Sequence, residues 1–552
     1  MQAEQSTGFE SVVDALTLSI DPTGVPNLDM VLGGGLVRGT LAIVVGPPGS
    51  GKTTLAIQMA VAAARTGRQA LILTALSEPS SKLLVHLRAY DFFDPELVGD
   101  HIKVLSLQPF LAAGLAGASR ELIDLAREAR ASLVVLDGFS GIRAADPDPL
   151  AGRRFMFEVG TALSAGGTTT IITTEAMVHD PLFFPEATTA DTIIGLHFSV
   201  YDERQRRRLE VVKARGATPM SGLHGLEIST AGILVSPRLE ARVVRATRER
   251  LTRPDSDAPD VPPALPTPPD ARARFDLPAL DALLDGGVTR ATTTVVIGSG
   301  GTGKTLLALH FALAGVRTGE PVVFMGFHEV RRQLLLKADA FNMGHDLRAA
   351  ILPGGGLTLI HYPPVELDPD ALADQLLATL DRTGAQRLIV DSIGVVERAV
   401  SEGSSPRRTR NYLAALISAL QARRVTALFT TETGPLAGRD LQLETDLSSS
   451  VAENVVWLQG VIFRNRQYRL LSVLKMRFSP HDLTLREFTI SAPAGIEVRA
   501  PAESARGVLA GIEREQGEFR PTAVDAVFGG DRRRRRGRVS AAGAEDPAQE
   551  TP

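Results

Sequence analysis

The sequence predicts an α/β fold made of two tandem domains, each with a mostly parallel sheet covered by helices. Short, continuous apolar runs such as LAIVV (41–45) and LVVLDG (133–138) alternate with helical stretches such as TTLAIQMAVAAARTG (53–67). Apolar runs of this kind are typical of parallel strands that are buried on both faces of a sheet. The same succession occurs a second time, which predicts two copies of one domain.

The internal repeat is seen in landmarks that recur in the same order about 250 residues apart. Each copy has a Leu-Asp pair, a glycine cluster and an apolar run before a glycine-rich loop, which is GPPGSGKTT (46–54) or GSGGTGKTL (298–306). The later pairs are LVVLDGF and LIVDSI, TTTIITTE and VTALFTTE, and LEVVKARG and LSVLKMRF. A period this long indicates tandem domains and not a solenoid of short repeats.

Composition shifts mark the domain boundaries. A run rich in proline and acidic residues joins the copies, and proline denies such a run the hydrogen bonds of helices and strands. Near the C-terminus, 503–517 predicts a short helix, and the polar, basic remainder with RRRRRGR predicts a disordered tail. The expected organisation is an N-terminal arm (1–14), domain one (15–250), a linker (251–271), domain two (272–500) and the C-terminal segment (501–552).

Net charge, cysteine content and the N-terminal sequence indicate which classes of protein are not expected. The net charge of −4 over 552 residues gives no overall attraction to nucleic acid or to membranes. Without cysteine the chain has no disulfides or Cys-based metal sites, which suits a reducing compartment. The polar N-terminus is unlike a signal peptide, and charges interrupt the alanine-rich helices before they could span a bilayer. We expect a cytoplasmic protein.

The two glycine-rich loops both fit the phosphate-loop pattern G-x-x-x-x-G-K-[ST]. Backbone N–H groups of such a loop surround phosphates, the lysine reaches the β- and γ-phosphates, and the hydroxyl residue binds Mg²⁺. The predicted cofactors are therefore ATP and Mg²⁺, with Thr53 and Thr305 at the metal. The expected cofactor residues are Gly46, Gly49, Gly51, Lys52, Thr53, Thr54, Gly298, Gly301, Gly303, Lys304, Thr305 and Leu306.

Carboxylates complete the predicted sites. Asp137 and Asp391 each end an apolar run. An acidic residue at this place would lie in the outer coordination shell of the metal. The alternative is that each aspartate caps a helix. Glu78 and Glu329 follow the next strand of each copy, where a carboxylate would act as base or position water. The alternative for both glutamates is a surface residue at the start of a helix.

These motifs together resemble the KaiC family, the circadian-clock ATPase and kinase with relatives in the RecA-like superfamily. The tandem loops, the LDMVLGGGLVRG entry and the basic hairpin ends carry the resemblance, which covers residues 15–515. It implies two RecA-like P-loop NTPase domains in a homo-hexamer of two stacked rings, with ATP between subunits. It also implies that four cations reach the nucleotide of the neighbouring subunit: Lys213, Arg215, Lys475 and Arg477. The alternative is that they lie on a solvated hairpin edge, where lysine and arginine discourage aggregation.

The chain departs from the family where two adjacent glutamates are usual. It has Ser77-Glu78 and His328-Glu329, and another alignment leaves copy one without a carboxylate. In place of the missing glutamate, we expect His328 to substitute as the base, since a histidine can accept a proton near neutral pH. The family's second domain phosphorylates two adjacent hydroxyl residues, which by resemblance are Ser449 and Ser450 here; the alternative is ordinary loop serines.

Three functions follow from these features. The first is a slow ATPase with serine autophosphorylation in domain two, in a ring with a signalling or timing role. The second is a RecA- or RadA-like DNA-dependent ATPase, but the basic tail has no interleaved aromatic residues for base stacking, so nucleic acid is not expected. The third is an ATP-dependent scaffold whose C-terminal segment docks regulatory proteins.

Overall fold

The computed structural model describes most of both domains. Predictions for Glu78, Ser449 and Ser450, for most of the linker and for the C-terminal helix and tail lie outside the described residues. The described ranges are 19–74, 80–112, 114–144, 146, 148, 150–178, 187–201, 203–252, 272–402, 405–432, 452–463 and 466–499.

The first domain is built on a sheet with the strand order β11-β10-β9-β8-β3-β7-β6-β4-β5. The strands from β8 to β5 in this order pair in parallel, whereas β9, β10 and β11 extend the sheet by antiparallel pairing. Their bounds are β3 (Leu41–Val45), β4 (Ala70–Thr74), β5 (Ile102–Ser106), β6 (Leu133–Asp137), β7 (Thr169–Thr174), β8 (Thr192–Tyr201), β9 (Arg204–Ala214), β10 (His224–Ser229) and β11 (Gly232–Ser236).

Helices cover both faces of this sheet. Leu41, Ile43 and Val45 of β3 pack on one side with α6, α7 and α8, while Ala42 and Val44 pack on the other with α3 and α4. Successive side chains of a strand point to opposite faces, so a strand buried on both sides is apolar throughout. The helices are α2 (Leu28–Leu32), α3 (Lys52–Arg65), α4 (Ser80–Leu87), α5 (Gln108–Leu111), α6 (Leu115–Glu128), α7 (Phe139–Ala144), α8 (Ala151–Ala165) and α10 (Leu239–Thr252); β1 (Ile20–Asp21) pairs with β2 (Leu36–Val37).

The second domain repeats this architecture with the strand order β16-β15-β17-β18-β14-β19-β20-β21-β22. The strands from β16 to β19 pair in parallel, and β20, β21 and β22 continue the sheet in antiparallel fashion. The bounds are β14 (Thr293–Gly298), β15 (Val322–Gly326), β16 (Leu357–His361), β17 (Arg387–Asp391), β18 (Thr426–Glu432), β19 (Asn454–Phe463), β20 (Arg466–Met476), β21 (Arg486–Ser491) and β22 (Gly495–Val498), with β12 (Arg272–Ala273) paired to β13 (Val288–Thr289).

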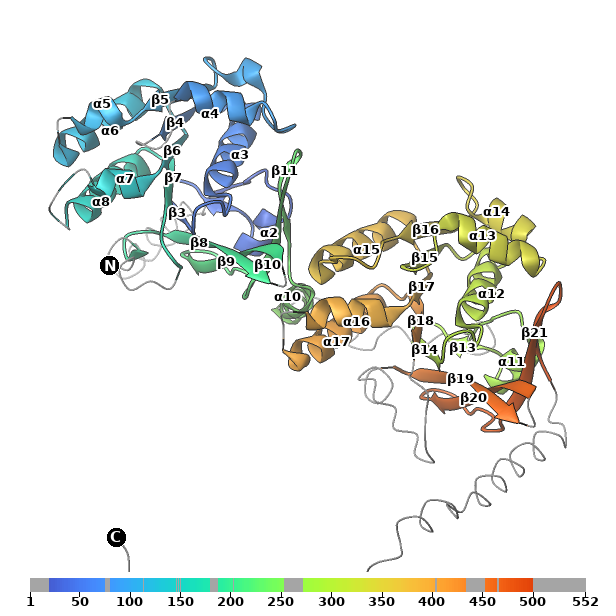
Figure 1. The fold of residues 1–552 in the computed structure, drawn as a ribbon. Helices are drawn as coiled ribbons and strands as arrows, with labels where there is room; N and C mark the ends of the chain where they lie inside the picture. Colours follow the sequence, from blue (N-terminus) through green and yellow to red (C-terminus); the bar gives the residue numbers. More distant parts are fainter. Residues whose placement is uncertain are drawn as a thin grey trace, which may run out of the picture.

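Figure 1 shows α12, α13 and α14 on one side of the second sheet and α15, α16 and α17 on the other. Val296 of β14 packs toward the first group, and Val295 and Ile297 pack toward the second. The helices are α11 (Pro278–Leu283), α12 (Lys304–Arg317), α13 (Arg331–Ala340), α14 (Gly344–Ala350), α15 (Pro369–Thr383), α16 (Ile393–Ser401) and α17 (Pro406–Ala422). The predicted class, two tandem α/β domains with mostly parallel sheets covered by helices, is confirmed.

The two domains meet through α10, which ends the first domain and packs against α15 and α17 of the second (Figure 1). Polar contacts accompany this packing: Arg242 forms an ion pair with Asp374, and Asn27 donates a hydrogen bond of 2.9 Å to the same carboxylate. No helix in the described ranges has the length and apolar character needed to cross a membrane.

Candidate nucleotide sites

Each phosphate loop lies at the carboxyl end of a central strand and leads into a helix. The first joins β3 to α3, and the second joins β14 to α12. The last loop residue before each helix, Gly51 or Gly303, has a φ of 101° or 99°. A Cβ there would lie 2.6 Å from Ile228 or Ile490, so both backbone conformation and packing require glycine. The helix N-terminus therefore opens directly onto the loop, an arrangement suited to phosphate.

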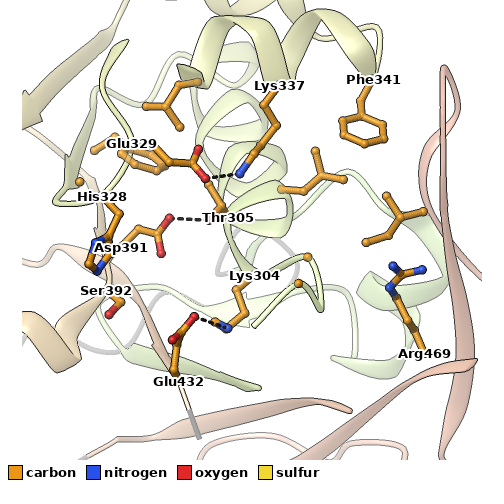
Figure 2. Close-up of a pocket in the computed structure, with 17 residues that line it drawn as sticks. Lys304, Thr305, His328, Glu329, Lys337, Phe341, Asp391, Ser392, Glu432 and Arg469 are labelled. Atoms are coloured by element: carbon orange, nitrogen blue, oxygen red, sulfur yellow. Dashed lines mark hydrogen bonds and ion pairs between the residues drawn. The ribbon is translucent and has the colours of Figure 1, made fainter. Parts of the chain in front are cut away.

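In the second domain the predicted residues converge on a cavity of about 620 Å³ (Figure 2). Lys304 and Thr305 come from the start of α12, and Asp391 from the end of β17. His328 and Glu329 follow β15 and lie at the same cavity. Parallel strands place their carboxyl ends at one edge, which explains how residues distant in sequence meet there.

Lys304 is held against its own loop. Its Nζ donates hydrogen bonds to the carbonyl oxygens of Gly298 (2.8 Å) and Ser299 (2.9 Å), and Glu432 lies 3.5 Å away. Burial lowers the pKa of Lys304, and the nearby carboxylates of Glu432 and Asp391 oppose that effect. A phosphate would supply the negative charge that this desolvated ammonium needs.

Thr305 and Asp391 form the oxygen-rich part of the site. The Thr305 hydroxyl donates to Asp391 Oδ2 over 2.7 Å, and Thr430 donates to the other carboxylate oxygen. Hydroxyl and carboxylate oxygens are the ligands that Mg²⁺ prefers, with waters and phosphate oxygens completing its shell. These side chains therefore fit Mg²⁺, and the described residues form no cluster of three or more His, Asp or Glu that would hold a metal unaided.

Glu329 combines one fixed oxygen with one free oxygen. Its Oε1 pairs with Lys337 of α13, whereas its Oε2 is buried and accepts no hydrogen bond among the described residues. Figure 2 shows the carboxylate at the cavity wall, with His328 lying near Asp391 and Ser392. An orphaned carboxylate oxygen costs free energy unless water or a hydroxyl reaches it. Glu329 is thus suited to accept a proton from such a group.

The first domain has the same arrangement around a cavity of about 480 Å³. Lys52 Nζ donates to the Pro47 carbonyl over 2.9 Å, and burial lowers the pKa of this lysine as well. Thr53 donates to Asp137 at 2.9 Å and 3.0 Å, and Thr173 donates to the same carboxylate at 2.6 Å. The two domains thus share one Lys–Thr–Asp geometry.

The four predicted hairpin cations do not line the cavity of their own domain. Lys213 Nζ donates to the Ala187 and Thr188 carbonyls, and Arg215 pairs with Asp191 over 3.4 Å. Lys475 Nζ likewise donates to the Ala452 carbonyl over 2.8 Å, and Arg477 follows at the end of β20. The hairpins place these cations near the amino ends of β8 and β19, away from the phosphate loops of the same chain.

Two pairs of cavity residues were missed by sequence reasoning. Arg207 and Arg469 each lie six residues before the hairpin lysine, and Glu175 and Glu432 end the TTE landmarks. Arg207 Nε donates to the Gly49 carbonyl over 3.2 Å, whereas Arg469 Nε is buried without a partner among the described residues. The signal was present, because RQRRRLEVVK and RQYRLLSVLK align with these arginines in register.

Comparison with known proteins agrees with the fold and the motifs. The family described as "ATPase: KaiC" matches residues 21–240 and 275–503. The chain is 26% identical to "Circadian clock protein KaiC3" of Synechocystis sp. over 92% of this chain and 97% of that protein. It is 27% identical to "Circadian clock oscillator protein KaiC" of Rippkaea orientalis, over 85% of this chain and 87% of the relative. With both repeats matched in order, the chain belongs to the KaiC ATPase family.

Proposed function

We propose that the chain binds Mg-ATP in both domains and hydrolyses it slowly, and that the second domain also transfers phosphate to its own Ser449 or Ser450. The observation that carries this proposal is the convergence of Lys304, Thr305, Asp391 and Glu329 on one cavity. Family membership supports the ATPase part. The autokinase part rests on the hydroxyl pair that matches the family's position in the sequence.

The chemistry assigned to the second site is in-line transfer of the γ-phosphoryl group. Lys304 neutralises charge on the β- and γ-phosphates, and Mg²⁺ held by Thr305 supplies further charge neutralisation when bound. The free Oε2 of Glu329 takes the proton of the attacking hydroxyl. A new oxygen–phosphorus bond forms as the bond between the γ-phosphorus and the bridging oxygen of ADP breaks. Water as the attacking group gives hydrolysis, and serine gives autophosphorylation.

We further propose that the active form is a homo-hexameric ring in the cytoplasm, with a signalling or timing role. The ring is supported by the four hairpin cations, which lie away from the cavities of their own chain: Lys213, Arg215, Lys475 and Arg477. In a ring, the neighbouring subunit would give these cations a nucleotide to contact. Light scattering tests the ring. Substitution of Lys475 and Arg477 by glutamine should lower turnover in the ATP-bound assembly without lowering ATP affinity of dilute monomers.

Phosphosite mapping tests the division of labour between the domains. Purified protein is incubated with Mg-ATP for a day, and phosphate is located by mass spectrometry. Lys304→Ala should abolish phosphorylation of Ser449 and Ser450 and leave the first domain's ATP binding intact. An equal effect of Lys52→Ala, or unmodified serines in a protein that turns over ATP, would exclude this autokinase assignment.

A further inference from the structure

A third cavity, of about 540 Å³, lies at the junction between the domains and is lined by guanidinium groups. Arg206 and Arg208 come from β9, Arg238 immediately precedes α10, and Arg408 lies in the first turn of α17. No described carboxylate lines this cavity. We propose that it binds a small anion carrying a diphosphate group, at a site separate from the two phosphate loops.

The carboxylates that accompany the β9 arginines lie outside the cavity lining. Arg206 donates to the Glu402 carbonyl over 2.8 Å and lies 3.3 Å from its carboxylate. Arg208 Nη1 lies 3.5 Å from both Asp368 and Asp370, without a hydrogen bond. These partners hold the two guanidinium groups in place, and none of the partners is among the residues that line the cavity.

The other two arginines are fixed in the same way. Arg408 donates to Asp370 over 2.6 Å, and both Arg408 and Arg238 lie 3.3 Å from Glu240. Gly222 makes room for Arg238, since a Cβ at that position would lie 2.2 Å from Arg238 Nη1. The cationic wall is therefore held by packing as well as by charge, unlike a set of mobile surface side chains.

Two donors at this wall have no acceptor. Arg206 Nε and Arg208 Nη1 are buried and donate no hydrogen bond within the described part of the chain. The side chains of Arg206 and Arg208 are only 14% and 15% exposed. Burial lowers the pKa of Arg206, and the like charges of Arg204 and Arg208 lower it further. A phosphate group in the cavity would offset this repulsion, and its geometry matches the guanidinium forks of the arginines that line the cavity.

The cavity also has an apolar side and a suitable size. The Arg206 guanidinium lies over the Tyr201 ring at 5.4 Å, and Val200 and Leu223 are exposed nearby. Its volume falls between those of the two nucleotide cavities, 480 Å³ and 620 Å³. A nucleoside diphosphate therefore fits as well as inorganic pyrophosphate does, and Tyr201 offers a surface on which a base can stack.

A neighbouring cavity differs because carboxylates share its lining with arginines. That cavity is lined by Arg204, Arg206 and Arg207 but also by four carboxylates, which belong to Glu203, Glu227, Glu366 and Asp368. An anion would meet carboxylates there, whereas in the guanidinium-lined cavity it meets four arginines. Charge complementarity therefore points to the guanidinium-lined cavity as the anion site.

Calorimetry of the full chain tests the site. Titrations with inorganic pyrophosphate and with ADP are made in the Lys52→Ala/Lys304→Ala background with EDTA, so that Mg²⁺-dependent binding at the phosphate loops is removed. We expect one equivalent of either probe. Arg238→Gln should weaken both probes by about tenfold or more, since a charge-assisted hydrogen bond is lost. Tyr201→Ala should weaken ADP more than pyrophosphate.

The matched control is Arg242→Gln, which removes a junction ion pair with Asp374 but no residue of the cavity lining. It should bind both probes like the background protein, and circular dichroism shows whether each variant is folded. Equal losses in Arg238→Gln and Arg242→Gln, no binding in the folded background, or sulfate binding as tight as pyrophosphate would each overturn the proposal. Because the assay omits Mg²⁺, its outcome is independent of the proposed ATPase and kinase activities.

Discussion

Arg469 should be a principal determinant of ATP affinity in the second domain. Its guanidinium lies on the cavity wall across from Glu329, and its buried Nε has no partner among the described residues (Figure 2). A hydrogen bond between charged groups contributes about 1.5–3 kcal/mol. Since about 1.4 kcal/mol corresponds to tenfold in affinity, Arg469→Gln should weaken Mg²⁺-dependent ATP binding by roughly 10- to 150-fold.

The assay is fluorescence titration with a labelled ATP analogue in the Lys52→Ala background, which leaves the second site as the Mg²⁺-dependent one. The control is Arg499→Gln, because Arg499 forms an exposed ion pair with Glu487 and such pairs contribute little. Thermal melting shows whether either variant is destabilised. A loss of less than about threefold for Arg469→Gln in a folded protein would show that the Arg469 guanidinium does not contact the phosphates of ATP.

Three further predictions concern catalysis and stability. Glu329→Gln should lower ATP turnover in the second domain by about 10²–10⁴-fold, because general-base catalysis is lost, while ATP affinity stays within a few-fold; unchanged single-turnover hydrolysis in the Lys52→Ala background would contradict this. Burial, with a contribution from Arg317, lowers the pKa of His310 to about 4, from 6.5 in the unfolded chain. The unfolded chain therefore binds the proton first, and stability should fall by up to about 3 kcal/mol as pH drops from 6.5 to 4; urea titrations of His310→Leu should show a flatter dependence. Glu320→Gln should destabilise the second domain by about 3–5 kcal/mol, because it leaves the buried Arg387 charge without its carboxylate, 2.5 Å away; a loss below about 1 kcal/mol in urea denaturation would contradict this.

The strand and loop framework was predictable because it depends on local patterns. Continuous apolar runs identified strands such as β3 and β17, and the phosphate-loop pattern located Lys52 and Lys304. Asp391 was recognisable because it ends an apolar run, and parallel pairing alone brings that strand end toward the loop.

Residues supplied by long-range pairing were harder to predict. Arg469 lies on the β19–β20 hairpin, and this hairpin reaches the second cavity because β19 pairs in parallel with β14, which precedes it by about 160 residues. The guanidinium-lined cavity combines Arg206 with Arg408, about 200 residues apart, and so depends on how the two domains meet.

The proposed function requires two Mg²⁺-dependent ATP sites in each chain, each built around its own phosphate loop. Equilibrium dialysis with radiolabelled ATP, with and without EDTA, tests it most directly. We expect two Mg²⁺-dependent equivalents of ATP per chain in the wild-type protein, one in Lys52→Ala, one in Lys304→Ala and none in the double variant. A single equivalent in the wild-type protein, or loss of both equivalents in either folded single variant, would contradict it.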